Sequence, residues 1–378
     1  MSKKYDVEFI QMSKYVRPIV EPSISSKWTL NGLNNEYYNY IKDCYDGSVT
    51  NKAIINAFKN YIYAEGLISK NENFNIYRYV SKNDIKLFVL DYKIYGGFAV
   101  QVIWNSSKDI KDKKPIYFKY IPIYKLGLNI DKDTQDINGY WYSFDWKNTS
   151  KYKPTFYQKF DGRYKYDESE KKGEDVEIYV VKRVSSDPWF ADCDYSAGLQ
   201  YAELEMELAN SSINHIKNGF QAGKIVNVPY VPETEELREQ VKRKIINQTS
   251  GSDKTNFTIV GFSDNPDNKI TIDNVQVTEL NAQYQNFEEL AEKKLIVAHQ
   301  APPVLFGGTR DGGGLGNNAE EIKTATQMLY RKIINPMRED ILDGLDYLLS
   351  FVEPQPKLEF KDFEEFNDIK NNDTTTNE

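Results

Sequence analysis

The residues best placed to do chemistry lie in a glycine-rich segment that carries one basic side chain. Residues 307–318 read GGTRDGGGLGNN, with six glycines between Gly307 and Gly316. A phosphate-binding Walker loop follows a strand and ends in Lys-Ser or Lys-Thr, whereas here a helical pattern precedes and two asparagines take that place. The sequence therefore disfavours nucleotide binding. Arg310 can instead contact a single phosphate without reading bases, and the alternative is a surface loop with no ligand.

A second candidate is the basic cluster Lys242, Arg243 and Lys244 on a predicted helix. Such a cluster is either a solvated helix face or a contact for a partner or nucleic acid. His215 and His299 each stand alone on a predicted helix, with no second ligand at metal-binding spacing, which favours surface or interface histidines. Because no GxSxG, CxxC or triad-like pattern occurs either, we expect no metal, no cofactor and no catalytic residue.

Composition indicates a globular protein and limits its partners. The 378 residues are 40% apolar and 14% aromatic, enough for a sizeable core in two or three domains. The net charge is −8, and eight acidic residues against three lysines lie between Glu353 and Glu378, so a broad basic face is not expected. No apolar run is long enough to span a membrane, and the start MSKKYDVEFIQMSKYV lacks the apolar core of a signal peptide. Cys44 and Cys193 fit small core residues in a reducing, intracellular compartment.

The elements that must position these residues begin with helices and a β-rich region. After an irregular lead-in with Pro18 and Pro22, helices are predicted over 36–45, 48–63 and 82–95. Short runs rich in Tyr, Phe, Val and Ile then predict antiparallel strands: FAVQVIW, IYFKYIP, GYWYSF, TFYQKF and EIYVVKRV.

The second half of the sequence has the clearest helices. Amphipathic helices over 195–219 and 282–299 flank a compact α/β insert, 223–277, with three strands and one helix. On the first of these helices, Glu203, Glu205 and Glu207 form the face opposite the apolar stripe. The last long helix, 319–351, should kink at Pro336. Apolar residues from Leu358 to Ile369 predict a short amphipathic helix that either packs on its own protein or docks on a partner.

Together these segments resemble the portal proteins of tailed bacteriophages, the rings at the capsid vertex through which DNA is packaged and ejected. The resemblance covers roughly Trp28 to Phe351, and the order and spacing of its motifs are more specific than any one of them. The motifs are WTLNGLNNEYYNYI, AIINAFKNYIYAEGL, DYKIYGGFAVQVIWN, SAGLQYAELEMELANSSINHIKNGFQAG, IVAHQAPPVLFGG, GNNAEE and IINPMREDI.

The resemblance implies an α+β, portal-like fold with an α/β wing, a two-helix stem, a small α/β clip insert and a long kinked C-terminal helix. The implied divisions are a lead-in at 1–27, the wing at 28–193, stem helices at 194–222 and 278–303, the clip at 223–277, a tunnel loop at 304–318, a wing or crown helix at 319–352 and a partly disordered acidic tail at 353–378. A substantial crown is not expected, because only a short tail follows Phe351. The implied DNA-channel residues are Gly307, Gly308, Thr309, Arg310, Asp311, Gly312, Gly313, Gly314, Leu315, Gly316 and Asn317. The implied clip residues that bind terminase and adaptor are Lys242, Arg243 and Lys244.

The implied function is structural rather than enzymatic, since the ATPase of DNA packaging belongs to the terminase. The implied partners are copies of the chain in a ring, usually a dodecamer, double-stranded DNA without sequence specificity, the terminase large subunit, the head–tail adaptor and the major capsid or scaffold protein, with no membrane. The implied location is the portal vertex of the virion, after assembly in the host bacterial cytoplasm. Two alternatives stay open: a portal of a defective prophage or gene-transfer particle, and a nucleotide-dependent enzyme that uses the glycine-rich loop.

Overall fold

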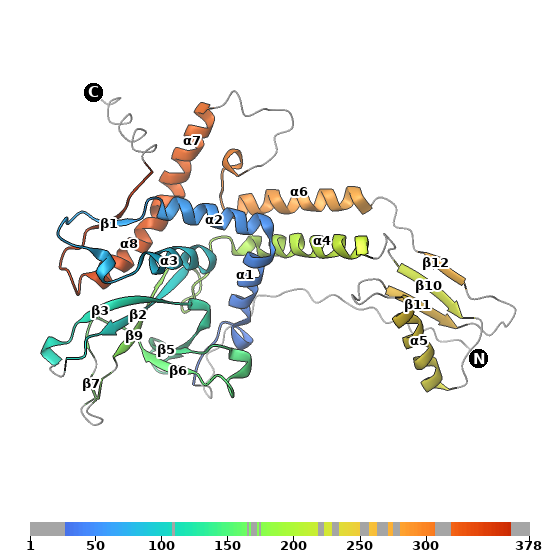
Figure 1. Ribbon diagram of the computed structural model, residues 1–378, viewed down its shortest axis with the longest axis horizontal. Coiled ribbons are helices and arrows are strands. Elements are labelled where there is room, and N and C mark those ends of the chain that lie inside the picture. The colour runs from blue at the N-terminus through green and yellow to red at the C-terminus, as the bar shows by residue number, and fades with distance from the viewer. Residues whose placement is uncertain are drawn as a thin grey trace. The chain divides into compact units, whose positions relative to one another are not determined.

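The computed structural model divides into two compact units (Figure 1). It describes residues 27–107, 110–164, 166–167, 172–173, 175–217, 223–228, 234–249, 257–262, 271–274, 280–306 and 319–363. The first unit contains residues 1–43, 55–194 and 327–378, and the second contains residues 44–54 and 195–326. Helices and mostly antiparallel strands occupy separate stretches of the chain, which is the α+β class predicted from the sequence.

A three-stranded antiparallel sheet is the centre of the first unit. Its strands, in the order β3-β2-β9, are β3 (Pro115–Ile121), β2 (Gly97–Trp104) and β9 (Val176–Lys182). Helix α3 (Lys82–Tyr95) covers one face of this sheet, where the Phe88 ring stacks on Phe98 with centroids 5.0 Å apart. Both rings are fully buried, so this contact forms part of the core.

The ends of α3 follow from local chemistry. Ser81 caps the N-terminus, because its hydroxyl accepts a hydrogen bond from the Asp84 N–H at 3.0 Å. Gly96 ends the helix at φ 77°, in the left-handed region. A Cβ at this position would lie 1.9 Å from the carbonyl oxygen of Asp192, so only glycine allows the chain segment before residue 194 to pass here.

A second antiparallel sheet lies against the other face of the first. It is a meander of β4 (Leu126–Ile130), β5 (Ile137–Tyr142) and β6 (Thr155–Gln158). Val180 of β9 and Tyr140 of β5 line one pocket between the two sheets. At the outer side Trp28 packs on Trp141 and Trp146, with ring centroids 5.6 Å apart in each pair.

Two strands from opposite ends of the sequence complete the first unit. β1 (Leu67–Ser69) pairs antiparallel with β13 (Leu358–Phe360). The helix predicted from Leu358 onward is therefore wrong over these three residues. Leu358 and Phe360 are buried while Glu359 between them is not, which is the two-residue period of a strand. Residues 364–369 of that prediction lie outside the described residues.

The last long helix is interrupted where the sequence contains a proline. It consists of α7 (Ala319–Leu329), a π-helical turn (Tyr330–Ile334) and α8 (Asn335–Leu349). Pro336 has no N–H to donate and crowds the preceding turn, and the wider π turn directly before it accommodates both effects. α8 packs closely on β9: a Cβ on Gly344 would lie 2.3 Å from a methyl group of Val181.

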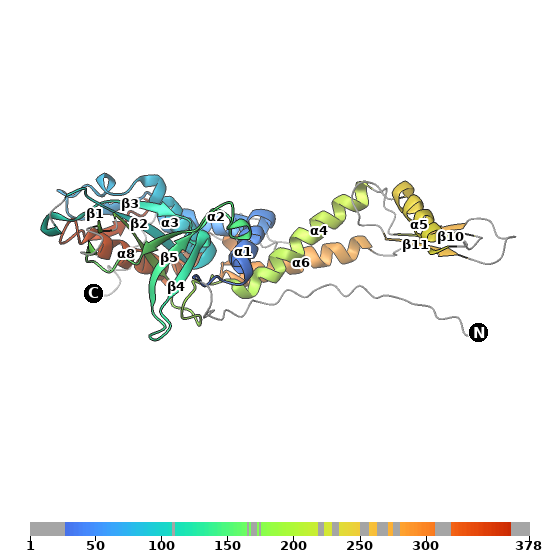
Figure 2. The same cartoon turned by 90° about the horizontal axis from the view of Figure 1, so that it is seen from below.

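Two antiparallel helices and a small sheet make up most of the described part of the second unit. α4 (Leu199–Lys217) and α6 (Leu280–Ala298) lie side by side (Figures 1 and 2), with Gly198 beside Ala298 and the Ser211 hydroxyl 3.0 Å from that of Tyr284. In the sheet, β10 (Gly223–Val228) pairs parallel with β11 (Phe257–Phe262) and antiparallel with β12 (Thr271–Asn274). Helix α5 (Glu235–Thr249) lies between β10 and β11 in the sequence, because two parallel strands need a crossover connection.

The remaining elements are short. α1 (Glu36–Gly47) and α2 (Val49–Tyr63) meet at Ser48, and β7 (Tyr166–Asp167) pairs with β8 (Lys172–Gly173). Single 3₁₀ turns occupy Leu33–Asn35, Ile76–Arg78, Ile110–Asp112, Ile123–Lys125, Trp146–Asn148, Ser196–Gly198 and Pro303–Leu305.

Candidate functional site

The segment that precedes α4 is fixed to the core of the first unit. The Tyr38 hydroxyl accepts a hydrogen bond from the Ala191 N–H at 3.2 Å and lies 3.3 Å from the carbonyl oxygen of the same residue. The Tyr37 hydroxyl donates to Asp192 Oδ1 at 2.8 Å. Both tyrosines come from α1 and both are buried. Burial raises the pKa of Tyr38, so its hydroxyl stays neutral and can serve as donor and acceptor at once.

A buried ion pair holds the last residue of this segment. Lys93 Nζ of α3 donates to both carboxylate oxygens of Asp194, at 2.9 and 2.8 Å. The exposed fractions of the two side chains are 0% and 6%. The ammonium also lies 4.3 Å from the centroid of the Phe58 ring. Burial raises the pKa of the neighbouring Cys193 thiol, which therefore stays protonated, and both cysteines are buried core residues as predicted.

In the second unit, α4 supplies a carboxylate to the start of α2. Ser48 caps α2, accepting from the Asn51 N–H at 3.2 Å, and its hydroxyl donates to Glu205. Glu205 also accepts from the Thr50 N–H at 3.2 Å and from its hydroxyl at 2.8 Å. The sequence analysis placed Glu205 on the face opposite the apolar stripe, and in the structure this half-buried carboxylate contacts the start of α2. A negative charge at a helix N-terminus is favourable, and the partners of Glu205 lie 155 and 157 residues away in the sequence.

The end of α6 is fixed by a histidine that the sequence analysis placed at the surface or at an interface. That prediction is wrong, because His299 is 0% exposed. Its Nε2 lies 2.8 Å from Asn51 Oδ1, and its ring stacks on Tyr195 with centroids 4.2 Å apart. Asn51 Nδ2 donates to the Cys44 carbonyl at 3.2 Å, so Oδ1 faces the ring and Nε2–H is the donor. His299 is therefore a structural residue that anchors the chain before the glycine-rich segment.

The predicted tunnel-loop residues, Gly307 to Asn317, lie outside the described residues, and their role stays a prediction. The structure does describe what flanks them. Before the loop, Ala301 is buried and its N–H donates to the Ile296 carbonyl at 3.0 Å. After it, α7 begins at Ala319 with Glu320 and Glu321 in its first turn, the favoured charge at that end.

The predicted basic cluster lies on α5. The side chains of Arg243 and Lys244 are exposed, whereas the side chain of Lys242 is not among those described. Arg238 and Val241, by contrast, are half-buried. These exposed cations are accessible to a partner, and their role in docking stays a prediction.

One side of α6 carries three exposed apolar side chains, with the exposed Lys294 between them. Phe287, Leu290 and Val297 are exposed by 45%, 40% and 71%. Their spacings of three and seven residues bring them to the same side of the helix. Ala291 and Leu295 are fully buried on the adjoining side, toward α4. A helix with one covered and one open apolar side is typical of an element that packs on a further polypeptide.

Within the described residues, no group of three or more His, Cys, Asp and Glu side chains is arranged to hold a metal ion. Over the same part of the chain, no helix is long and apolar enough to cross a membrane.

Comparison with known proteins gives a likeness of fold. No family model and no curated protein matches the sequence. A chain in the neck of a native gene transfer agent (GTA) particle, computed with C12 symmetry, matches with a TM-score of 0.53 at 11% identity, over 89% of this chain and 88% of that one. The neck of an empty GTA particle, computed with C6 symmetry, gives 0.54 at 11% identity over 90% and 88%. An HK97-family phage portal protein from Corynebacterium diphtheriae gives 0.45 at 10% identity over 83% and 90%.

These matches run across nearly the whole chain, so both units and their order along the sequence are shared with the particle-neck proteins. The α+β class predicted from the sequence is confirmed, and the fold is similar to that of chains in GTA particle necks.

Proposed function

We propose that this chain is a portal protein: a structural subunit that forms a ring at a capsid vertex and conducts double-stranded DNA without reading its sequence. The observation that carries the proposal is the shared fold with chains of a GTA particle neck over about nine-tenths of both chains. The neck of the native particle was computed with C12 symmetry, which supports a ring of twelve copies. The neck of the empty particle was computed with C6 symmetry, which a ring of twelve copies also has. Since the matched particle is a gene transfer agent, a portal of such a particle is the more specific form of the proposal.

The open side of α6 is the surface proposed to join neighbouring subunits. In a ring every subunit presents the same two surfaces, and a repeated head-to-tail contact closes when the rotation between copies allows it. Phe287, Leu290 and Val297 supply such a patch, and burying it removes apolar area from water. Glu289 and Lys293 beside it already form an ion pair at 3.2 Å, so the rim of this contact is polar.

The other partners are proposed from two segments whose roles stay predictions, the loop 307–318 and helix α5. We propose that the loop 307–318 faces DNA, with Arg310 as its phosphate contact. Arg243 and Lys244, both exposed, support a docking surface on α5 for the terminase large subunit and then the head–tail adaptor. The ring would also contact the major capsid or scaffold protein and reside in the virion after assembly in the bacterial cytoplasm. Its role would be structural, and the ATPase would belong to the terminase.

The proposal is tested by imaging the purified protein in negative stain and weighing the assembly by sedimentation. We expect rings with an axial hole for the wild-type chain. Val297→Asp should disperse them, because a carboxylate buried in an apolar contact without a partner costs several kcal/mol. Gln285→Asp is the matched control: it adds the same charge at an exposed position on a different side of α6 and should keep the rings.

Two results would contradict these proposals. A wild-type chain that stays monomeric at high concentration and in the presence of capsid protein would overturn the portal assignment. Rings formed by Val297→Asp as readily as by wild type would exclude the α6 face as the contact. Saturable ATP or GTP binding, abolished by changing Arg310, would instead favour the nucleotide-dependent alternative.

A further inference from the structure

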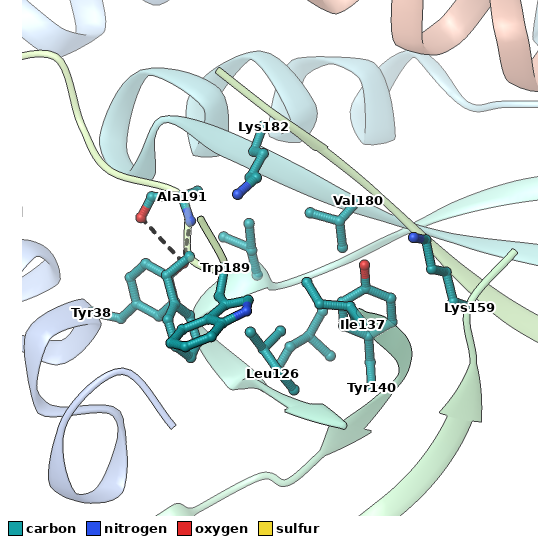
Figure 3. Close-up of a pocket in the computed structure, with 12 residues that line it drawn as sticks. Tyr38, Leu126, Ile137, Tyr140, Lys159, Val180, Lys182, Trp189 and Ala191 are labelled. Carbon is teal, nitrogen blue, oxygen red and sulfur yellow. Dashed lines mark hydrogen bonds between the residues drawn. The ribbon is translucent and has the colours of Figure 1, made fainter. Parts of the chain in front are cut away.

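The first unit contains a pocket between its two sheets (Figure 3). Its volume is about 150 Å³, and its side walls include Leu126 and Ile137 from one sheet and Val180 from the other. The Trp189 indole and the Tyr38 ring close one end. All of these residues belong to the first unit, so the pocket is defined within one body.

The aromatic end of the pocket is held in place by contacts of its own. The Trp189 indole N–H donates to the Gln135 carbonyl at 3.3 Å, and the Tyr38 hydroxyl accepts from the Ala191 N–H at 3.2 Å. The Tyr38 and Phe190 rings meet edge to face, with centroids 6.1 Å apart. Because these side chains are already fixed, a ligand that packs against them does not have to order them, which lowers the cost of binding.

The Tyr140 hydroxyl is the polar group that indicates a ligand. Tyr140 is 4% exposed, and its hydroxyl is directed into the pocket (Figure 3). Over the described part of the chain, this hydroxyl has no hydrogen-bond partner. Burial raises the pKa of Tyr140, so the group stays a neutral O–H donor. A buried hydroxyl without a partner is costly, so a ligand that brings an acceptor to it would be stabilised.

A second donor lines the same pocket, the ammonium of Lys182. It donates to the carbonyl oxygens of Pro188 at 2.6 Å and Asp187 at 3.4 Å, which uses two of its three N–H groups. Burial lowers the pKa of Lys182, and the charge of Asp187 only partly opposes that effect. An anionic group at this ammonium would therefore be stabilising.

Volume and lining together define the chemical class of the ligand. An apolar cavity of about 150 Å³ holds one benzene-sized ring. Water is a poor occupant, because each buried water needs about two to four polar partners and most of this lining is aromatic or aliphatic. The Trp189 and Tyr38 rings favour an aromatic ligand, which they can meet edge to face. A carboxylate has two acceptor oxygens, one for the Tyr140 hydroxyl and one for the Lys182 ammonium.

We infer that this pocket binds a single-ring aromatic carboxylate, whose ring lies between the sheets against Trp189 and whose carboxylate accepts from the Tyr140 hydroxyl and the Lys182 ammonium. The inference does not depend on the proposed portal assembly, because every group that it uses lies in the first unit. Its failure would leave that proposal untouched, and the reverse is also true.

Calorimetric titration of the full-length protein with benzoate tests the inference. We expect saturable binding with a Kd of about 10 mM or tighter, which is the range for a ligand of this size. Tryptophan fluorescence should change with the same affinity, and Trp189→Phe should remove that change, since this indole lines the pocket. Toluene and benzamide, which have similar shapes but no negative charge, should each bind about tenfold more weakly than benzoate.

Matched protein variants locate the site. Tyr140→Phe and Lys182→Met remove the two donors with little change in shape, so each should weaken benzoate binding about tenfold and leave toluene binding unchanged. Val180→Phe should abolish the binding of both ligands, because the added ring fills the cavity. Tyr117→Phe and Lys119→Met, the same two changes on β3 outside the lining, should leave every affinity unchanged. Circular dichroism verifies that each variant is folded.

Three results would overturn the inference. The absence of saturable benzoate binding would favour a cavity that holds only water. Equal affinities for benzoate and toluene would show that the pocket does not select a carboxylate. Benzoate binding that is unchanged by Tyr140→Phe, Lys182→Met and Val180→Phe would place the ligand elsewhere on the protein.

Discussion

Replacing Lys93 by methionine tests whether a buried charge pair holds the chain at Asp194, before α4 begins. Methionine keeps the length and apolar stem of lysine but removes the ammonium, which leaves the Asp194 carboxylate 6% exposed and without its bidentate donor. Removing one member of a buried pair costs about 3–5 kcal/mol, because the remaining charge is uncompensated. At about 1.4 kcal/mol per factor of ten, the folding equilibrium should shift by roughly a hundredfold to a few thousandfold.

The assay is urea unfolding followed by tryptophan fluorescence. All five tryptophans, Trp28, Trp104, Trp141, Trp146 and Trp189, lie in the first unit, so the signal reports on the body that contains the pair. Lys70→Met is the matched control: the Lys70–Glu359 pair is 2.8 Å long but 61% and 40% exposed, and its loss should cost no more than about 1 kcal/mol.

A double variant, Lys93→Met with Asp194→Leu, separates the pair from its surroundings. It should recover much of the lost stability, since removing both charges leaves no buried ion behind. A Lys93→Met variant within about 1 kcal/mol of wild type would refute the reasoning, because water or another cation would then be compensating Asp194 in solution. A double variant as unstable as the single one would show that packing rather than charge is what Lys93 contributes.

Two further predictions concern other buried ionisable groups of the first unit. Arg338 pairs with Asp362 and donates to the carbonyls of Ile62 and Tyr61 at 2.9 Å each. Arg338→Met should therefore lower the free energy of unfolding by about 3–5 kcal/mol and increase hydrogen exchange in β1 and β13. Unchanged exchange in these strands would contradict the prediction. Burial raises the pKa of Asp91 to about 7, so the native state retains a proton that the unfolded chain loses near pH 4, and stability falls between about pH 4 and 7. Asp91→Asn should flatten that part of the urea-unfolding profile, by up to about 4 kcal/mol at pH 8 relative to pH 4; a parallel profile would show that Asp91 titrates normally.

Elements with a strong local pattern could be predicted from the sequence. The helix predicted over 82–95 matches α3 (Lys82–Tyr95), because Ser81, the apolar face and Gly96 all lie within sixteen residues. The predicted strands and helix of the insert likewise correspond to β10, α5, β11 and β12. β1 and β13 could not be predicted, since each has three residues and a partner at the opposite end of the chain.

The charged residues that hold the chain before α4 were harder to predict from the sequence than the helices and strands. Lys93 follows Ile85 and Val89 at four-residue spacing, so a lysine on an apolar helix face could have indicated a buried pair. Its partner, 101 residues away, could not be found without the fold. The same holds for Glu205, whose partners are 155 and 157 residues away, and for His299, whose partner is 248 residues away. The roles of Arg310 and of the basic cluster stay predictions.

The pairing of β1 with β13 has a consequence for how the protein is made. Ser69 donates a hydrogen bond to the Pro356 carbonyl, and these residues are 287 positions apart. At about 5–20 residues per second, a ribosome needs roughly a quarter of a minute to a minute to synthesise the interval between them. During that time β1 has no partner strand, while residues 195–326 of the second unit are all synthesised. The inserted unit can therefore mature on the nascent chain before the unit that surrounds it in the sequence is closed, and β1 is the strand that a chaperone would have to shield meanwhile.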